Sequence, residues 1–297
     1  MSQEQLLYPG GFVEAQGDKP AYIMAGTGET VTYRELHERA CRIAQLIRSR
    51  GIEPGEHVAW CMENHPWFLS LAWGALYAGV YFTAISSRLT AEEVAYIVND
   101  CGAKLFVTTP YKAEIAAELM ELTPGVQARF SLDSTLDGHE SFEDAVNEQA
   151  AEELSEAIAG ADMLYSSGTT GRPKGVKVPL AGVPVTQPEP LYMLVAGLFG
   201  ANADTTYLSP APLYHAAPLR FCMQVQRGGG TVIVMEQFDP VETLRLIEKY
   251  KVSFAQFVPT MFVRMLKLDP DQRSAYDVSS IQVAVHAAAP CPIAVKE

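Results

Sequence analysis

Two kinds of hydrophobic pattern alternate along the chain. Short runs of β-branched and aromatic residues are typical of buried strands, and longer segments with apolar residues at every third or fourth position are typical of amphipathic helices. Strands that alternate with helices in this way form β-α-β units and mainly parallel sheets. The sequence therefore predicts an α/β protein with strands at 57–62, 80–84, 104–109, 127–132, 231–235, 252–257 and 281–285.

Local signals mark where several predicted helices begin and end. Thr32 and Thr90 each precede a glutamate by three positions, which is the spacing of a capping box, and Pro240 follows an aspartate that can cap a helix. The uncharged segment 66–87 is long enough to cross a bilayer. Gly79 interrupts it, and the residues that follow are rich in β-formers. We therefore predict a buried helix and then a buried strand, with no integral membrane segment.

Composition narrows the possible functions. The chain has 297 residues, of which 48% are hydrophobic and 19% charged, so it can form one large folded domain or two ordinary ones. A net charge of -13 argues against nucleic acid as a partner, since binding to phosphate backbones needs clustered Lys and Arg. The five cysteines show no C-x-x-C spacing and the N-terminus has no signal-peptide pattern. Both features favour a cytoplasmic protein with reduced thiols.

The run "YSSGTTGRPKGV" at 165–176 is the strongest candidate for chemistry. Its glycines allow the backbone to approach a ligand closely, while turn N–H groups and hydroxyls can bind an anion. Lys174 adds a positive charge behind the rigid Pro173. The run directly follows a predicted strand at 161–165, where doubly wound sheets bind ligands. These features together predict a phosphate-binding loop.

Two other interpretations of this run are a P-loop and a plain turn. A P-loop NTPase requires G-x-x-x-x-G-K-[ST], but Pro173 stands where the second glycine should be and Gly175 follows the lysine, so this class is excluded. An exposed polar hairpin turn between two strands is the structural alternative. A plain turn needs two to five residues and no particular lysine, which makes it the weaker interpretation.

The run resembles the phosphate-loop signature [Y/F]-[S/T]-S-G-T-T-G-x-P-K-G-V of the adenylate-forming superfamily. That superfamily includes acyl-CoA synthetases, firefly luciferase and the adenylation domains of peptide synthetases. The resemblance extends over nearly the whole chain. It includes the T-Y-x-E-L helix and following strand at 31–60, an A-G-rich segment at 74–108, "PAPLYHAAPL" at 210–219, "FVPTMFVRML" at 257–266 and "HAAAPCP" at 286–292.

This resemblance implies a fold of two doubly wound, mainly parallel sheets with helices on both faces, as in the five-layer large domain of these enzymes. Residues 1–297 would form the N-terminal part of the AMP-binding domain. A first α/β subdomain at 52–204 would carry the phosphate loop, and 1–51 plus 205–297 would form a second one. Family members continue with Y-G-x-T-E and T-G-D motifs, a hinge and a mobile C-terminal domain. None of these motifs occurs here, so we expect the N-terminal portion of a synthetase without its lid domain, incapable of complete acyl-CoA synthesis alone.

The resemblance also implies roles for individual residues. The phosphates of ATP would be held by Ser166, Ser167, Gly168, Thr169, Thr170, Gly171 and Lys174. Of these, Thr169, Thr170 and Lys174 would contact the departing pyrophosphate, with Thr169 and Lys174 as catalytic residues. His215 would orient the carboxylate beside the nucleotide, as a catalytic and substrate-binding residue. Val258, Pro259 and Thr260 would border the channel for the second substrate. Ala288, Ala289 and Pro290 would lie against adenine, although Ala287 replaces a glycine common in relatives.

The implied reaction has two halves. A carboxylate attacks the α-phosphate of ATP, with Mg²⁺ as a cofactor, to give an acyl-adenylate and pyrophosphate; the thiol of coenzyme A then displaces AMP. The uncharged, Met-containing stretch from Leu191 to Ala203 favours a lipophilic acid. We expect a fatty acid, with aryl or steroid side-chain acids as alternatives. An adenylation domain that loads a carrier protein, and a non-catalytic nucleotide-binding fragment, stay open. The oligomeric state is open as well, with a homodimer as one alternative. No residue is predicted as a metal ligand.

Overall fold

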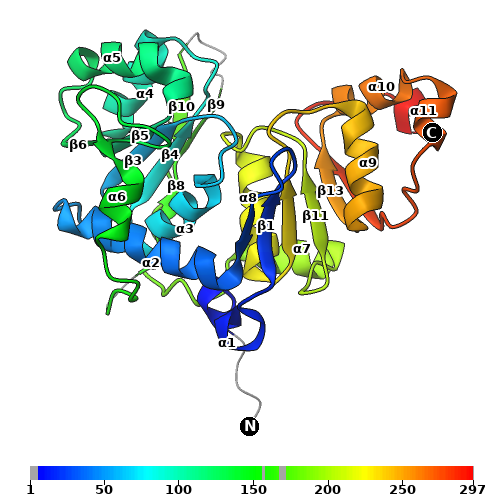
Figure 1. Ribbon diagram of the computed structural model, residues 1–297, viewed down its shortest axis with the longest axis horizontal. Helices are drawn as coiled ribbons and strands as arrows, with labels where there is room; N and C mark the ends of the chain where they lie inside the picture. Colours follow the sequence, from blue (N-terminus) through cyan, green and yellow to red (C-terminus); the bar gives the residue numbers. More distant parts are fainter. Residues whose placement is uncertain (1–5, 156–157, 167–171, 297) are drawn as a thin grey trace. The chain divides into compact units, whose positions relative to one another are not determined.

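The computed structural model describes residues 6–155, 158–166 and 172–296, and every structural statement below concerns those residues. They form two compact units (Figure 1). One unit combines Met1–Glu35 with Pro188–Glu297, and the other is the continuous segment Leu36–Gln187. No helix among the described residues is long and apolar enough to cross a membrane.

The continuous unit, Leu36–Gln187, is built on a six-stranded sheet whose described pairings are all parallel, in the order β7-β6-β5-β3-β4-β8. The register is regular, with Trp60 opposite Ala84 on one side and Val107 on the other. The strands are β3 (His57–Cys61), β4 (Tyr81–Ile85), β5 (Ala103–Thr108), β6 (Ala128–Ser131), β7 (Glu140–Ser141) and β8 (Ala161–Asp162). The helices are α2 (Tyr33–Ser49), α3 (Phe68–Ala78), α4 (Ala91–Cys101), the 3₁₀-helix η2 (Pro110–Lys112), α5 (Ala113–Leu122) and α6 (Phe142–Asn147).

Helices cover both faces of this sheet because successive side chains of a strand point to opposite faces. On one face Ala59 packs in a cluster with Val98 of α4 and Leu119 of α5. On the other face the Trp60 ring lies edge-on to Phe68 of α3, 5.7 Å away. All residues of β3 and β4 are buried, which explains why these strands are continuous hydrophobic runs in the sequence.

The second unit contains a six-stranded sheet in the order β14-β13-β11-β12-β1-β2. Its strands are parallel except for β2, which pairs antiparallel with β1. Segments distant in sequence meet here, since Tyr22 is opposite Val232. The strands are β1 (Pro20–Met24), β2 (Thr30–Thr32), β11 (Thr206–Ser209), β12 (Thr231–Val234), β13 (Phe254–Phe257) and β14 (Val283–His286). The helices are η1 (Pro9–Phe12), α1 (Val13–Gln16), α7 (Pro190–Phe199), α8 (Ala216–Arg227), α9 (Pro240–Tyr250), α10 (Pro259–Leu266), α11 (Pro270–Ser274) and α12 (Ile293–Lys296).

This sheet is also covered on both faces. Ile233 packs with Leu246 of α9 and Met261 of α10 in one apolar cluster. On the opposite face, aromatic rings of β11 and β13 pack against α7 and α8. Tyr207 stacks on Phe221 at 6.2 Å. Both sheets are therefore mainly parallel and flanked by helices, and the predicted fold class is confirmed.

Several elements were not predicted from the sequence, among them the β1–β2 hairpin, helix α8 and helix α6. The hairpin of β1 and β2 has short strands separated by polar and glycine residues, which give little periodicity. Helix α8 has Pro218 in its first turn, where proline is tolerated because no N–H there donates within the helix. Helix α6 has only six residues, which is too short for a clear helical period in the sequence.

Candidate functional site

The described ends of the glycine-rich run form a two-stranded antiparallel hairpin. Strand β9 (Leu164–Ser166) pairs with β10 (Lys174–Val176), and Ser166 stands opposite Lys174. Both of these residues are exposed to solvent. The predicted phosphate-binding residues Ser167, Gly168, Thr169, Thr170 and Gly171 lie outside the described residues. Antiparallel pairing of the two strands is what the turn interpretation predicts. The connection of seven residues, 167–173, is longer than a plain turn.

Tight packing beneath the hairpin leaves no room for a side chain at 175 unless its neighbours move. A Cβ atom built on Gly175 would lie 2.4 Å from the terminal methyl of Met163 and 2.8 Å from Cζ of Tyr165. Met163 is buried, and Tyr165 packs against the same apolar cluster as α4. This glycine therefore serves close packing of the β10 backbone on the unit's core.

Side chains of the sheet hold the strand that leaves the hairpin. The Tyr81 hydroxyl donates a hydrogen bond to the Val178 carbonyl at 2.8 Å. The Lys177 ammonium lies 4.4 Å from the Tyr81 ring centre and 2.9 Å from Nε2 of His57. Because an ammonium can only donate, the His57 ring is neutral and accepts through Nε2. Burial, with a smaller contribution from Lys177, lowers the pKa of His57 to about 4.

In the other unit, the remaining predicted residues gather at the carboxyl edge of the parallel sheet. The chain passes from β11 to β12 on one side and then crosses to β13 on the other, so β11 and β13 border a topological switch point. Parallel α/β sheets bind ligands in this position. His215 ends the loop after β11, and Val258 directly follows β13.

Two helices begin at this switch point. His215 is the N-cap residue of α8, where it is exposed and has extended backbone angles, and its carbonyl accepts from Leu219 N–H at 3.2 Å. Val258 is the N-cap residue of α10, with Pro259 buried and Thr260 exposed in the first turn. Free N–H groups and the helix dipole make such termini favourable for anions, which suits a carboxylate or a phosphate.

The predicted adenine segment lies beside these residues. Strand β14 pairs with β13 so that His286 is opposite Phe257, and Ala287 N–H donates to the Phe257 carbonyl at 3.2 Å. Ala288 has φ of +71°, a left-handed conformation that is rare for a residue with a Cβ. Ala288, Ala289 and Pro290 are all exposed. The glycine expected in relatives is replaced at 287, but the strained backbone is one residue later.

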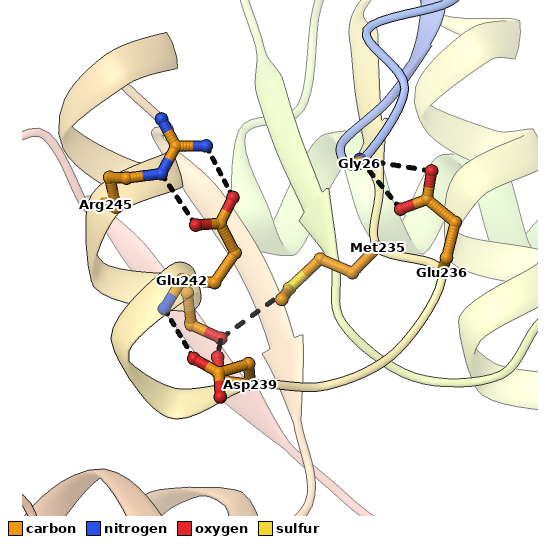
Figure 2. Close-up of polar contacts among 7 residues, drawn as sticks. Gly26, Met235, Glu236, Asp239, Glu242 and Arg245 are labelled. Atoms are coloured by element: carbon orange, nitrogen blue, oxygen red, sulfur yellow. Dashed lines mark hydrogen bonds and ion pairs between the residues drawn. The ribbon is translucent and has the colours of Figure 1, made fainter.

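The same edge contains a pocket that sequence reasoning missed. It has a volume of about 390 Å³ and lies at the carboxyl ends of β1 and β12. Figure 2 shows the Glu236 carboxylate directed at Gly26, whose N–H donates to it at 2.9 Å, and the Glu242 carboxylate directed at Arg245. The lining residues are Ala25, Gly26, Thr27, Met235, Glu236, Gln237 and Glu242. A glycine-rich turn after one strand and an acid directly after another are the signals that could have located it.

The described residues place a glycine-rich hairpin in one unit and a set of exposed loops at a switch point in the other. Comparison with known proteins gives these features a family context. The feruloyl-CoA synthase of Amycolatopsis sp is 32% identical over 272 residues, which are 89% of this chain and 50% of the relative. A long-chain-fatty-acid–CoA ligase of Mycobacterium tuberculosis is 30% identical over 250 residues, covering 81% of this chain and 47% of the relative.

A solved structure agrees with these sequence relatives. The inhibitor-bound N-terminal domain of FACL13 from Mycobacterium tuberculosis superimposes with a TM-score of 0.82 at 26% identity, over 97% of this chain and 70% of that chain. The chain spans about half the length of the curated relatives that it matches. The family model described as AMP-binding enzyme matches residues 12–297. The chain belongs to the AMP-binding enzyme family.

Proposed function

We propose that the protein activates a carboxylic acid with ATP to give an acyl-adenylate and then transfers the acyl group to the thiol of coenzyme A. The observation that carries this proposal is the hairpin at 165–176, with the adenylate-forming signature, in a chain that matches the AMP-binding family over 12–297. The relatives with known names, a feruloyl-CoA synthase and a fatty-acid–CoA ligase, support the same reaction type.

The hairpin supplies the ATP side of the reaction. Lys174 is exposed at the start of β10, opposite Ser166, where its ammonium can neutralise charge that develops on the departing pyrophosphate. We propose that neighbouring hydroxyls and N–H groups complete the phosphate-binding loop. They belong to Ser167, Gly168, Thr169, Thr170 and Gly171. Among the described residues no group of three or more His, Cys, Asp or Glu side chains could hold a metal ion. Mg²⁺ carried by ATP needs no such cluster, because phosphates and water supply most of its ligands. Bound to the ATP phosphates, Mg²⁺ would offset their negative charge.

The carboxyl edge of the other sheet is proposed to supply the acyl side. His215 would orient the carboxylate for attack on the α-phosphate, and Val258 and Thr260 would border the path of the coenzyme A thiol. The backbone of Ala288, Ala289 and Pro290 would contact adenine. The support for this assignment is their common position at a switch point with two helix N-termini.

We propose a lipophilic carboxylate as the substrate class. Helix α7 contains no charged residue. Its Met193, Leu194 and Leu198 are exposed, while Val195 is buried. Phe199 of the same helix packs on Phe254, 5.6 Å away, so only part of the helix serves the core. The exposed apolar side chains suit an aryl acid as well as a fatty acid.

A substrate panel tests the proposal. The protein that carries this chain is incubated with MgATP and ferulate, 4-coumarate, decanoate or palmitate, with and without coenzyme A. Pyrophosphate release is measured together with loss of the free thiol. We expect pyrophosphate release with at least one acid, and thiol loss in the same reaction.

The outcomes separate the alternatives. Pyrophosphate release without thiol loss, combined with acyl transfer to a phosphopantetheine carrier protein, would favour carrier loading instead. No release with any acid, together with measurable MgATP binding, would favour a non-catalytic nucleotide-binding protein.

A further inference from the structure

One face of α4 contacts the hairpin at β9 and at the residues just before β10. Tyr96 and Asp100 are four residues apart and therefore lie on the same face of this helix. Tyr96 contacts residues that precede β10, while Asp100 contacts β9. The helix thus holds the hairpin on both sides of the connection between its strands.

Tyr96 makes two contacts immediately before Lys174. Its hydroxyl donates a hydrogen bond to the Pro173 carbonyl at 3.3 Å. The guanidinium carbon of Arg172 lies 5.3 Å from the centre of the Tyr96 ring, within the range of a cation–π interaction. Since Pro173 has a fixed φ, holding its carbonyl restricts the direction in which the chain enters Lys174.

Asp100 holds the opposite strand through a single strong contact. Its carboxylate accepts a hydrogen bond from the Tyr165 hydroxyl at an O···O distance of 2.5 Å. Burial, followed by this hydrogen bond, raises the pKa of Tyr165, so the phenol remains a donor at neutral pH. Tyr165 is opposite Gly175 in the hairpin, and the Tyr165 ring fills the space that a Cβ at 175 would need.

Helix α4 is a firm support for these contacts. Its opposite face is buried in the core, where Val94 and Val98 pack against β3 and β5. A capping box at Thr90 fixes its start, and Gly102, with φ of +68°, fixes its end. In contrast, the side chains of Arg172 and Lys174 are exposed, and apart from the pairing of Lys174 with Ser166 few described contacts restrain them.

We propose that Tyr96 and Asp100 are positioning residues that set the location of Lys174 for ATP. The inference rests on the proposed adenylate-forming function. The lysine lies one residue after the carbonyl that Tyr96 holds, and displacement of a catalytic group by about 1 Å can cost up to about 100-fold in rate. Neither residue touches the nucleotide in this account; both act through the hairpin.

The test uses the protein that carries this chain and MgATP as the probe. MgATP affinity is measured by calorimetry, and KM for MgATP and for the carboxylate by pyrophosphate exchange. Tyr96→Phe removes one hydrogen bond but keeps the ring, so we expect a loss of MgATP affinity of about threefold to tenfold. Tyr96→Leu removes both contacts, and we expect a larger loss of about tenfold to thirtyfold. Asp100→Asn is expected to resemble Tyr96→Phe.

A structural role alone would change the folding midpoint without a selective change in KM. We therefore expect KM for MgATP to rise, KM for the carboxylate to stay within twofold, and the thermal midpoint of Tyr96→Phe to stay near wild type. Tyr111→Phe, which removes a hydroxyl from an exposed tyrosine of the same unit, is the matched control and should behave as wild type.

The outcomes distinguish the inference from the function on which it rests. Absence of MgATP binding by the wild-type protein would overturn the proposed function and the inference with it. Normal wild-type binding together with unchanged affinity in Tyr96→Phe, Tyr96→Leu and Asp100→Asn would overturn the inference alone. If Tyr96→Leu does not fold, the two conservative variants decide.

Discussion

The hairpin of the continuous unit and the sheet edge of the other unit hold their candidate residues in different ways. The hairpin is a small two-stranded element whose position depends on side-chain contacts from Tyr81, Tyr96 and Asp100. The loops after β11 and β13 instead take their position from the order of parallel strands in a six-stranded sheet. One region is therefore placed by specific side chains and the other by topology.

This difference has consequences for mutation. A change in a few side chains can displace the hairpin while the fold stays intact, because an isolated two-stranded hairpin has little stability of its own. The sheet edge should tolerate changes in neighbouring side chains, since its backbone is fixed by buried strands on both sides. Variants in the hairpin should act on ATP, and variants of His215 at the edge on the acyl substrate.

Removal of the Lys174 charge should have the largest effect. We expect Lys174→Ala to lower ATP–pyrophosphate exchange by about 100-fold or more, because an electrostatic contact to the developing pyrophosphate charge is lost. Lys267→Ala, at an exposed lysine after α10, is the matched control and should retain wild-type exchange. Near-normal exchange in Lys174→Ala would remove Lys174 from the ATP site.

The second effect concerns the sheet edge. His215→Ala should reduce exchange by about tenfold to a hundredfold, with the loss mainly in kcat and in KM for the carboxylate. KM for MgATP should stay within about threefold, which is the opposite of the result expected for hairpin variants. Equal changes in the two KM values would contradict the division of labour between the regions.

A smaller effect is expected from packing beneath the hairpin. Gly175→Ala places a methyl group against Met163 and Tyr165, and the resulting displacement of β10 should weaken MgATP binding several-fold. Gly125→Ala is a matched control, because a Cβ built there meets no atom within 4 Å. Calorimetric MgATP titrations of the two variants make the comparison, and equal affinities would show that hairpin packing is unimportant for ATP.

The smallest effect at neutral pH involves the base of the hairpin. His57 has a folded-state pKa of about 4, below the ordinary 6.5, so the unfolded chain takes up a proton first. Its contribution to stability is complete above pH 6.5 and is lost as the pH falls towards 4. His57→Phe should reduce the slope of unfolding free energy against pH in this window by at most about 1.4 kcal/mol per pH unit. Urea titrations between pH 4 and 7 measure it; parallel slopes for the two proteins would contradict the assignment.

Local signals in the sequence were sufficient for much of the fold. The capping box at Thr90 is present with both of its hydrogen bonds, and Gly79 ends α3 with φ of +71°. Such features depend on residues three or four positions apart, which are visible in the sequence. The hydrogen bond from Tyr96 to Pro173 joins residues 77 positions apart, and no local pattern indicates it.

The candidate site also has a part that local sequence predicts and a part that only tertiary structure reveals. The composition of 165–176 predicts a phosphate-binding loop, since glycines, hydroxyls and a lysine occur together, and this stays a prediction because 167–171 lie outside the described residues. His215 alone after an aromatic residue carries little information, and its assignment came from the family resemblance. The strand order that places His215 and Val258 at one switch point arises from tertiary pairing of β11 with β13, so only the structure reveals it.

The most direct test of the account follows an oxygen atom. The protein that carries this chain is given MgATP, coenzyme A and a carboxylic acid that it accepts as a substrate, labelled with ¹⁸O in the carboxylate. The products are analysed by mass spectrometry. Attack of the carboxylate on the α-phosphate, followed by thiol displacement, predicts one ¹⁸O atom in AMP and none in pyrophosphate. Label in orthophosphate with formation of ADP, or unlabelled AMP accompanying thioester formation, would contradict an acyl-adenylate intermediate.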